Sequence, residues 1–117
     1  MTELGFSKKY RLLKRAEFVL LRNTGKKVHS DCFIAQFTGN NRNNSRLGLT
    51  ISKKAGNAAT RNRLKRQVRE RFRTSKQNLC GCWDINIIAK KNIAQCSSEK
   101  VFSSLDKIFE KISSHDI

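Results

Sequence analysis

The segment that decides the fold runs from Arg46 to Arg73 and reads RLGLTISKKAGNAATRNRLKRQVRERFR. Residues 46–52 place an apolar side chain at every second position, which is typical of a strand with one buried face. After Gly56, with Asn57 as the expected N-cap, residues 58–74 follow a helical period. A strand that leads into a long helix predicts a layered α+β domain.

The predicted helix has two chemically different faces. Leu64, Val68 and Phe72 recur every four residues and therefore form one apolar stripe. The polar side of the helix carries Asn62, Lys65, Arg66, Arg69 and Arg73. From residue 53 to residue 73 the chain holds nine basic residues and one acidic residue. We expect this helix to pack by one face and to present guanidinium groups on the other.

A face of one charge sign predicts a polyanionic partner. Solvated faces usually mix signs, and like charges four residues apart, such as Lys65 and Arg69, oppose helix formation. The planar arginine side chain binds two phosphate oxygens at once. The unpaired N–H groups at the helix start, with Lys53 and Lys54 just before them, form an expected phosphate site. Asn62 is placed to bind a base edge or a 2′-hydroxyl group.

The segments before this region predict a helix and a strand. A helix is expected over residues 13–22, with Leu13, Ala16, Glu17, Leu20 and Leu21 at helical spacing and a stop at residues 23–25. A strand is expected over residues 32–38, with Phe33, Ala35 and Phe37 on one face. The asparagine-rich stretch 39–45 predicts a hairpin loop between this strand and the one that begins at Arg46.

The segments after it predict a strand and a final helix. Residues 83–89 should form a strand in which Trp83 starts the core and Ile85, Ile87 and Ala89 share a face. Residues 98–112 should form a helix. Its apolar stripe consists of Val101, Leu105, Ile108 and Ile112, flanked by Phe102 and Phe109.

Composition limits the class of protein. The 117 residues predict a single domain, and 25 basic against 9 acidic side chains give a net charge of +16. Such a charge predicts RNA, DNA or an anionic membrane as partner. No apolar run is long enough to cross a membrane, and residues 1–5 do not resemble a signal peptide, so we expect a cytoplasmic protein. Its cysteines, Cys32, Cys80, Cys82 and Cys96, are then expected to be free thiols.

The chain does not look like a catalyst on its own. Its acidic residues are scattered, whereas metal-dependent nucleases cluster carboxylates around Mg²⁺. Glu17 and Glu70 stand among basic residues and are expected ion-pair partners. His29 and His115 are expected at the surface. Cys80 and Cys82 have one residue between them and no second pair, which is a poor pattern for zinc. We expect no catalytic residue and no protein-bound metal.

The basic segment and the segments around it resemble a known protein family. The stretch from Arg46 to Arg66, in which Ser52-Lys53-Lys54 leads into Arg61-Asn62-Arg63, resembles the signature of the bacterial ribonuclease P protein component. The likeness extends to residues 12–18, Gly25, Phe33 and residues 84–90, in the same order along nearly the whole chain.

The resemblance implies a fold and an activity. The expected fold is a single α+β sandwich over residues 1–117, of αβββαβα order, with a central four-stranded sheet and a left-handed βαβ crossover. The implied enzyme is a ribonucleoprotein endoribonuclease that hydrolyses a phosphodiester bond to remove the 5′ leader of precursor tRNA. Its RNA subunit and that RNA's Mg²⁺ would perform the hydrolysis, and the protein would promote it at low Mg²⁺. The implied partners are ribonuclease P RNA and precursor tRNA, with no membrane and no required protein partner.

The resemblance also assigns residues to two sites. Contacts to the RNA subunit would come from Lys53, Lys54, Asn57, Arg61, Asn62, Arg63, Lys65, Arg66 and Arg69. A cleft between the first helix, the sheet and the last helix would hold the single-stranded leader, lined by Phe18, Arg22, Phe33 and Gln36. Some members have aromatic residues where this chain has Arg22 and Gln36, which predicts weak sequence preference for the leader. Phe18 fits a core position equally well.

Three other functions stay open on the residues alone. A ribosomal or general RNA-binding scaffold fits the composition equally well. A DNA-binding regulator is disfavoured, because a strand at residues 47–51 precedes the basic helix where a helix-turn-helix needs a short helix. An enzyme in its own right is disfavoured by the scattered carboxylates.

Overall fold

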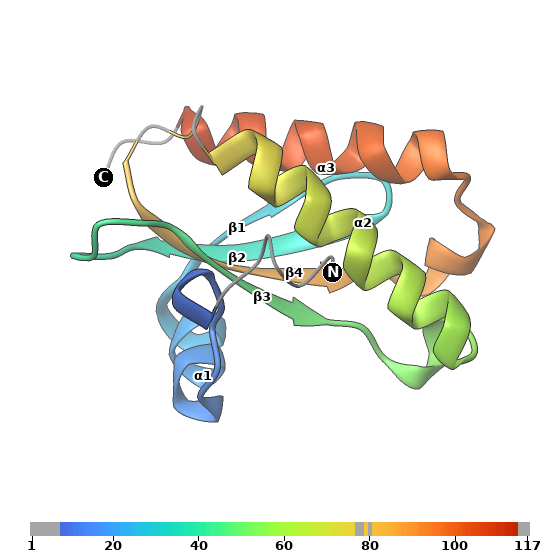
Figure 1. Ribbon diagram of the computed structural model, residues 1–117, viewed down its shortest axis with the longest axis horizontal. Coiled ribbons are helices and arrows are strands. Elements are labelled where there is room, and N and C mark those ends of the chain that lie inside the picture. Colours follow the sequence, from blue (N-terminus) through green and yellow to red (C-terminus); the bar gives the residue numbers. More distant parts are fainter. Residues whose placement is uncertain (1–7, 77–78, 80, 115–117) are drawn as a thin grey trace.

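The computed structural model describes residues 8–76, 79 and 81–114, which form a sandwich of αβββαβα order (Figure 1). The helices are α1 (Arg15–Thr24), α2 (Ala58–Ser75) and α3 (Ser98–Ser113). The strands are β1 (Lys26–His29), β2 (Phe33–Gly39), β3 (Arg46–Thr50) and β4 (Trp83–Ala89). The short 3₁₀ turns are η2 (Lys8–Tyr10), η3 (Lys53–Ala55) and η5 (Lys91–Gln95). The predicted α+β class and element order are confirmed.

The sheet separates two helical layers. Its strand order is β1-β2-β4-β3. Helices α2 and α3 lie side by side on one face, and α1 lies against β2 and β4 on the other (Figure 1). The outer edge of β3 is partly covered by the segment after η2, where the Leu12 N–H donates to the Leu47 carbonyl over 2.9 Å. The sheet therefore carries the α2–α3 layer on one face and α1 on the other.

The predicted hairpin between β2 and β3 is wrong, because β4 lies between these strands. β4 pairs antiparallel with β2 and parallel with β3, with Ile85 opposite both Phe37 and Leu47. Consecutive residues Ile85, Asn86 and Ile87 are all buried, as expected for a central strand covered on both faces. The loop after β2 instead packs at the start of β4, where the Asn40 N–H donates to the Cys82 carbonyl over 3.0 Å.

The main core lies between the sheet and the α2–α3 layer. The predicted stripe of α2 is buried, with Leu64, Val68 and Phe72 at most 3% exposed. The predicted stripe of α3 is also buried, and Phe109 adds to it beside the Phe72 ring. On the sheet, Phe37 and Trp83 meet edge to face with ring centroids 5.5 Å apart. These residues confirm the periodicities that predicted both helices and β4.

Helix α1 differs from its prediction in start and in buried face. It begins at Arg15, because the Glu17 carboxylate accepts the backbone N–H groups of Leu13 and Lys14, each over 3.1 Å. Leu13 therefore precedes the helix. Leu13 and Leu20 are 59% and 57% exposed, and only Leu21 of α1 is fully buried.

A shared ion pair joins α1 to the sheet. The Arg46 guanidinium on β3 lies 2.8 Å from a Glu17 oxygen on α1 and 2.8 Å from an Asp84 oxygen on β4. Burial opposes ionisation of Glu17, but the N–H groups of Lys14 and Leu13 and the Arg46 guanidinium outweigh it and lower the pKa of Glu17. The Asp84 carboxylate is the main reason that the pKa of Arg46 is raised. The expected ion pair of Glu17 is confirmed, as is that of Glu70, which lies 2.6 Å from Arg73.

Replacing the shared cation should destabilise the fold. We expect Arg46→Met to lower the free energy of unfolding by about 3 kcal/mol at pH 7, because two largely buried carboxylates lose their partner. Glu17 has a lowered pKa in the folded state, so its contribution is present above its ordinary value of 4.5 and is lost as the pH falls through the folded pKa. Urea unfolding at several pH values should thus show the two proteins converging below about pH 4.5. A constant difference down to pH 3 would contradict this assignment.

Candidate RNA-binding surface

The entry into α2 is a tight turn that fixes the basic helix. Gly56 has φ +142°, and a Cβ there would lie 2.9 Å from Cγ2 of Thr60, so glycine is required. The Asn57 side chain accepts the Thr60 N–H over 2.9 Å, which confirms the predicted N-cap. Lys53 and Lys54 in η3 are exposed just before the helix start. The turn therefore holds two lysines beside the positive end of the helix.

The outer face of α2 is open to a ligand. Asn62, Arg63 and Arg66 are exposed, and Lys65 and Arg69 are partly exposed. Glu70 is the one acidic residue in the sequence of α2, and it pairs with Arg73. The predicted one-sided distribution of charge is present in the fold.

Two basic residues of α2 have structural contacts as well. The half-buried Arg61 donates from Nε to the Gly56 carbonyl over 3.2 Å and so braces the turn. Arg71 lies 3.2 Å from Asp106, and its guanidinium stacks 4.5 Å from the centre of the Phe102 ring, which ties α2 to α3. Loss of Arg61 would therefore disturb the turn in addition to removing a charge.

A groove between α1 and β3 adjoins this face. One hollow of about 540 Å³ is lined by Leu13, Arg15, Phe18, Val19, Arg22, Leu49, Thr50 and Ile51. A second, of about 220 Å³, is lined by Arg11, Leu12, Leu13, Phe18, Leu47, Gly48, Leu49, Lys65 and Arg69. The two hollows share Leu13, Phe18 and Leu49. They form one groove with an apolar floor, with arginines of α1 on one side and basic residues of α2 on the other.

Phe18 is both packed and accessible. Its ring lies on Gly48 of β3, where an added Cβ would be 2.5 Å from the ring atom Cε1. Phe18 is partly exposed and lines both hollows. Sequence reasoning did not identify Gly48 as part of the groove, although a glycine inside a strand often marks a close approach by another group.

Two of the residues that the resemblance assigned to the leader cleft do not line this groove. Phe33 is 0% exposed and belongs to the core that faces α3, so it does not line the groove. Gln36 lies on the opposite face of β2 but is only 7% exposed, and its oxygen accepts from Asn86 over 3.5 Å. Because α3 covers the other side of the sheet, this groove lies between α1, β3 and α2, whereas the resemblance implied a cleft with the last helix as one wall. Arg22 lines this groove, and its role in binding the leader stays a prediction.

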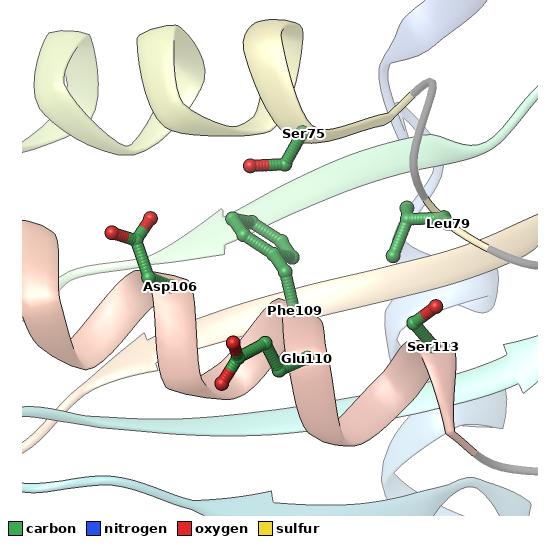
Figure 2. Close-up of a pocket in the computed structure, with 6 residues that line it drawn as sticks. All are labelled: Ser75, Leu79, Asp106, Phe109, Glu110 and Ser113. Carbon is green, nitrogen blue, oxygen red and sulfur yellow. The ribbon is translucent and has the colours of Figure 1, made fainter.

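A separate hollow lies between the end of α2 and α3 (Figure 2). It has a volume of about 310 Å³ and is lined by Ser75, Leu79, Asp106, Phe109, Glu110 and Ser113. Figure 2 shows the Asp106 and Glu110 carboxylates on successive turns of α3. Carboxylates repel phosphate, so this hollow is unsuited to a nucleic-acid backbone.

The described residues contain neither a cluster of metal ligands nor a helix suited to cross a membrane. No group of three histidine, cysteine or acidic side chains that could hold a metal is found among them. Cys80, His115, Glu3 and Asp116 lie outside the described residues, so the Cys80–Cys82 pattern is not tested. His29 is exposed on β1, as predicted. Within the same residues, no helix has the length and apolar character that a membrane span requires.

The chain is similar to known proteins along nearly its whole length. Residues 6–113 match the family model described as Ribonuclease P. The Ribonuclease P protein component of Desulfosudis oleivorans is 50% identical over 113 residues, which cover 97% of this chain and 93% of that relative. The protein of the same name from Desulforapulum autotrophicum is 43% identical, covering 96% of each.

Solved structures agree in fold. The RNase P protein of Staphylococcus aureus superposes with a TM-score of 0.81 at 32% identity, covering 90% of this chain and 95% of that one. The RNase P protein of Thermotoga maritima superposes with a TM-score of 0.79 at 33% identity, covering 87% and 96%.

A single exposed arginine should test the basic face without affecting the fold. We expect Arg66→Ala to weaken RNA affinity and to reduce the slope of log K against log salt by about 1, since one phosphate contact is lost. The free energy of unfolding should change by less than about 0.5 kcal/mol. Filter binding across a salt series and thermal melts measure the two effects.

Lys107→Ala provides the matched control, because Lys107 is exposed on α3 and its replacement removes the same single positive charge. Lys107→Ala should leave RNA affinity and salt slope close to those of the unaltered protein. Equal losses in the two variants would mean that net charge alone, and not the α2 face, determines binding.

Proposed function

The chain belongs to the ribonuclease P protein family, and from that membership we propose that it binds the catalytic RNA with α2 and the 5′ leader of precursor tRNA in the α1–β3 groove. The family is the protein component of ribonuclease P, an endoribonuclease that acts in tRNA processing. Partnership with ribonuclease P RNA follows from this membership. The surfaces used, and the precursor tRNA contact, are our proposal.

The outer face of α2 and the turn before it would bind the RNA subunit. The proposed contacts are Lys53, Lys54, Asn57, Arg61, Asn62, Arg63, Lys65, Arg66 and Arg69. Arginines on a rigid helix can bind phosphates bidentately, and Asn62 can bind a 2′-hydroxyl group. The Asn57 side chain is engaged as the N-cap, so its part in binding would be to orient the free helix end. Contacts of this kind, to phosphates and to 2′-hydroxyl groups, recognise the shape of an RNA more than its base sequence.

The groove would hold the leader as a single strand. The lining of the groove supports this proposal, because a partly exposed aromatic ring lies on an apolar floor between two basic walls. Single-strand sites combine base stacking on aromatic rings with basic side chains that follow the backbone. Phe18 would stack a base, while Arg15 and Arg22 on one wall and Lys65 and Arg69 on the other would contact phosphates. With one ring lining the described groove, we expect little discrimination between leader sequences.

The same charges would lower the need for Mg²⁺. Two RNA molecules repel each other until cations gather between them, and Mg²⁺ does this in the absence of protein. A protein of net charge +16 placed at their junction replaces part of that cation requirement. Under this proposal the chain supplies no catalytic group, and the Mg²⁺ ions that act in hydrolysis are held by RNA. A cytoplasmic location stays a prediction.

A DNA-binding regulator gains no support from the fold. In the described residues, α2 is preceded by β3 and the three-residue turn η3. A helix-turn-helix needs a helix at that place.

Cleavage of precursor tRNA by a bacterial ribonuclease P RNA at low Mg²⁺, with and without this protein, tests the proposal. The protein should stimulate cleavage, and the stimulation should be larger for a substrate with a leader of several nucleotides than for one with a single nucleotide. Binding of RNA without any stimulation would reduce the protein to a general RNA-binding scaffold.

Phe18→Ala should separate the two surfaces. We expect it to raise the KM for leader-containing precursor tRNA roughly 10-fold, since stacking contributes about 1–3 kcal/mol per base. The affinity for the RNA subunit alone should change less than 2-fold, because α2 is untouched. Steady-state kinetics and direct binding to the RNA subunit provide these two values.

Gly48→Ala tests the seat of that ring. The added Cβ should displace Phe18, so KM for leader-containing substrate should rise while RNA-subunit affinity is kept. Leu20→Ala, at an exposed position of α1, is the control and should have no effect on KM. An unchanged KM in both Phe18→Ala and Gly48→Ala, in proteins that melt normally, would refute the groove assignment.

A further inference from the structure

Two cysteines that are distant in sequence meet beside the main core. Cys32 precedes β2 and Cys96 follows η5, and their Sγ atoms are 2.7 Å apart as free thiols. This is within about 0.7 Å of the usual disulfide bond length of roughly 2.0 Å. Neither residue lines the groove, and neither belongs to the basic face. The pair is therefore a separate feature of the molecule.

The backbone holds both thiols in place. The Cys32 carbonyl accepts the Lys90 N–H over 2.9 Å at the end of the β2–β4 ladder. The Cys96 N–H donates to the Ile93 carbonyl over 3.1 Å, and Ile93 is 2% exposed in the core. Lys90 also donates from Nζ to the Ser30 carbonyl over 2.6 Å. The two sulfur atoms thus approach each other from braced segments.

The two cysteines differ in access. Cys32 is 0% exposed, whereas Cys96 is partly exposed. Burial and the neighbouring Cys32 thiol raise the pKa of Cys96 to about 11, so the Cys96 thiol is protonated at neutral pH and must lose its proton before it reacts. An oxidant from solvent meets Cys96 first, and Cys32 is then the nearest group that can react with the product.

We propose that Cys32 and Cys96 are a redox modification site that closes to a reversible intramolecular disulfide when the protein meets a peroxide. The Cys96 sulfur, after loss of its proton, attacks a peroxide oxygen, the O–O bond breaks, and a sulfenic acid forms with release of water. The Cys32 sulfur then attacks the sulfenic sulfur, the S–O bond breaks, and a second water leaves. Two thiols lose two electrons and two protons in total, and one hydrogen peroxide becomes two waters.

The bond would join the start of β2 to the start of α3. It would link two cysteines whose residue numbers differ by 64, and closing a loop of this length gives a large loss of entropy in the unfolded chain. It also lies next to η5, which packs against η3, the turn that carries Lys53 and Lys54. We expect oxidation to stabilise the fold and to change RNA affinity less than 2-fold, since neither Cys32 nor Cys96 belongs to the proposed RNA surface.

The test uses a full-length protein in which only this pair can react. In Cys80→Ser/Cys82→Ser, exposure to hydrogen peroxide should lower the intact mass by about 2 Da and abolish alkylation by N-ethylmaleimide. The melting temperature should rise by roughly 10 °C, and dithiothreitol should reverse every change. Adding Cys96→Ser, at a partly exposed position, should remove the mass change and the shift in melting temperature.

Other products would overturn the proposal. A sulfinic or sulfonic acid on Cys96 with Cys32 still free would show that the second step fails. A covalent dimer, or an intramolecular disulfide that lowers the melting temperature, would show that the bond does not form in the native arrangement. These readouts do not involve RNA, so their failure is distinguishable from failure of the proposed function.

Discussion

The buried guanidinium of Arg46 is the interaction on which the arrangement of the site depends. It is shared by Glu17 of α1 and Asp84 of β4, each at 2.8 Å, while Arg46 itself belongs to β3. A cation that is removed from water needs such partners, because its desolvation is otherwise costly. The three elements are therefore held together at one point. As a consequence α1 is held against the sheet, where Phe18 reaches Gly48 of β3 and lines the groove.

The remaining charge is left where a ligand can reach it. Some of the basic side chains pair with acids in the described residues: Arg46 and Arg71 join elements to one another, and Arg73 pairs with Glu70 within α2. On the α2 face, Asn62, Arg63 and Arg66 are exposed. Lys65 and Arg69 belong to both the α2 face and the groove, since they project from α2 and line the groove. One continuous basic surface can thus bring two RNA segments together.

Periodicity was sufficient for some elements and not for others. Periodicity predicted the apolar stripes of α2 and α3 and the strand β4. In a regular element with one buried face, apolar residues recur at the period of the helix or strand. Periodicity did not predict which strand pairs with β2. The asparagine-rich loop after β2 indicates a change of chain direction but does not specify the neighbouring strand. The prediction for the first helix failed at two leucines. Leu20 is apolar but exposed, and Leu13 precedes the helix because the Glu17 carboxylate binds its backbone N–H group. Phe33 was placed in the groove by analogy alone, although its own alternation with Ala35 and Phe37 predicted the core.

Site-specific crosslinking in the assembled ribonucleoprotein tests most directly whether the two adjoining surfaces bind different RNAs. A photoreactive side chain would replace Arg66 on the α2 face in one protein and the exposed Leu13 of the groove in another. We expect position 66 to crosslink to the catalytic RNA and position 13 to the 5′ leader of precursor tRNA. Crosslinks from both positions to the same RNA, or with the two partners exchanged, would contradict the assignment of the two surfaces.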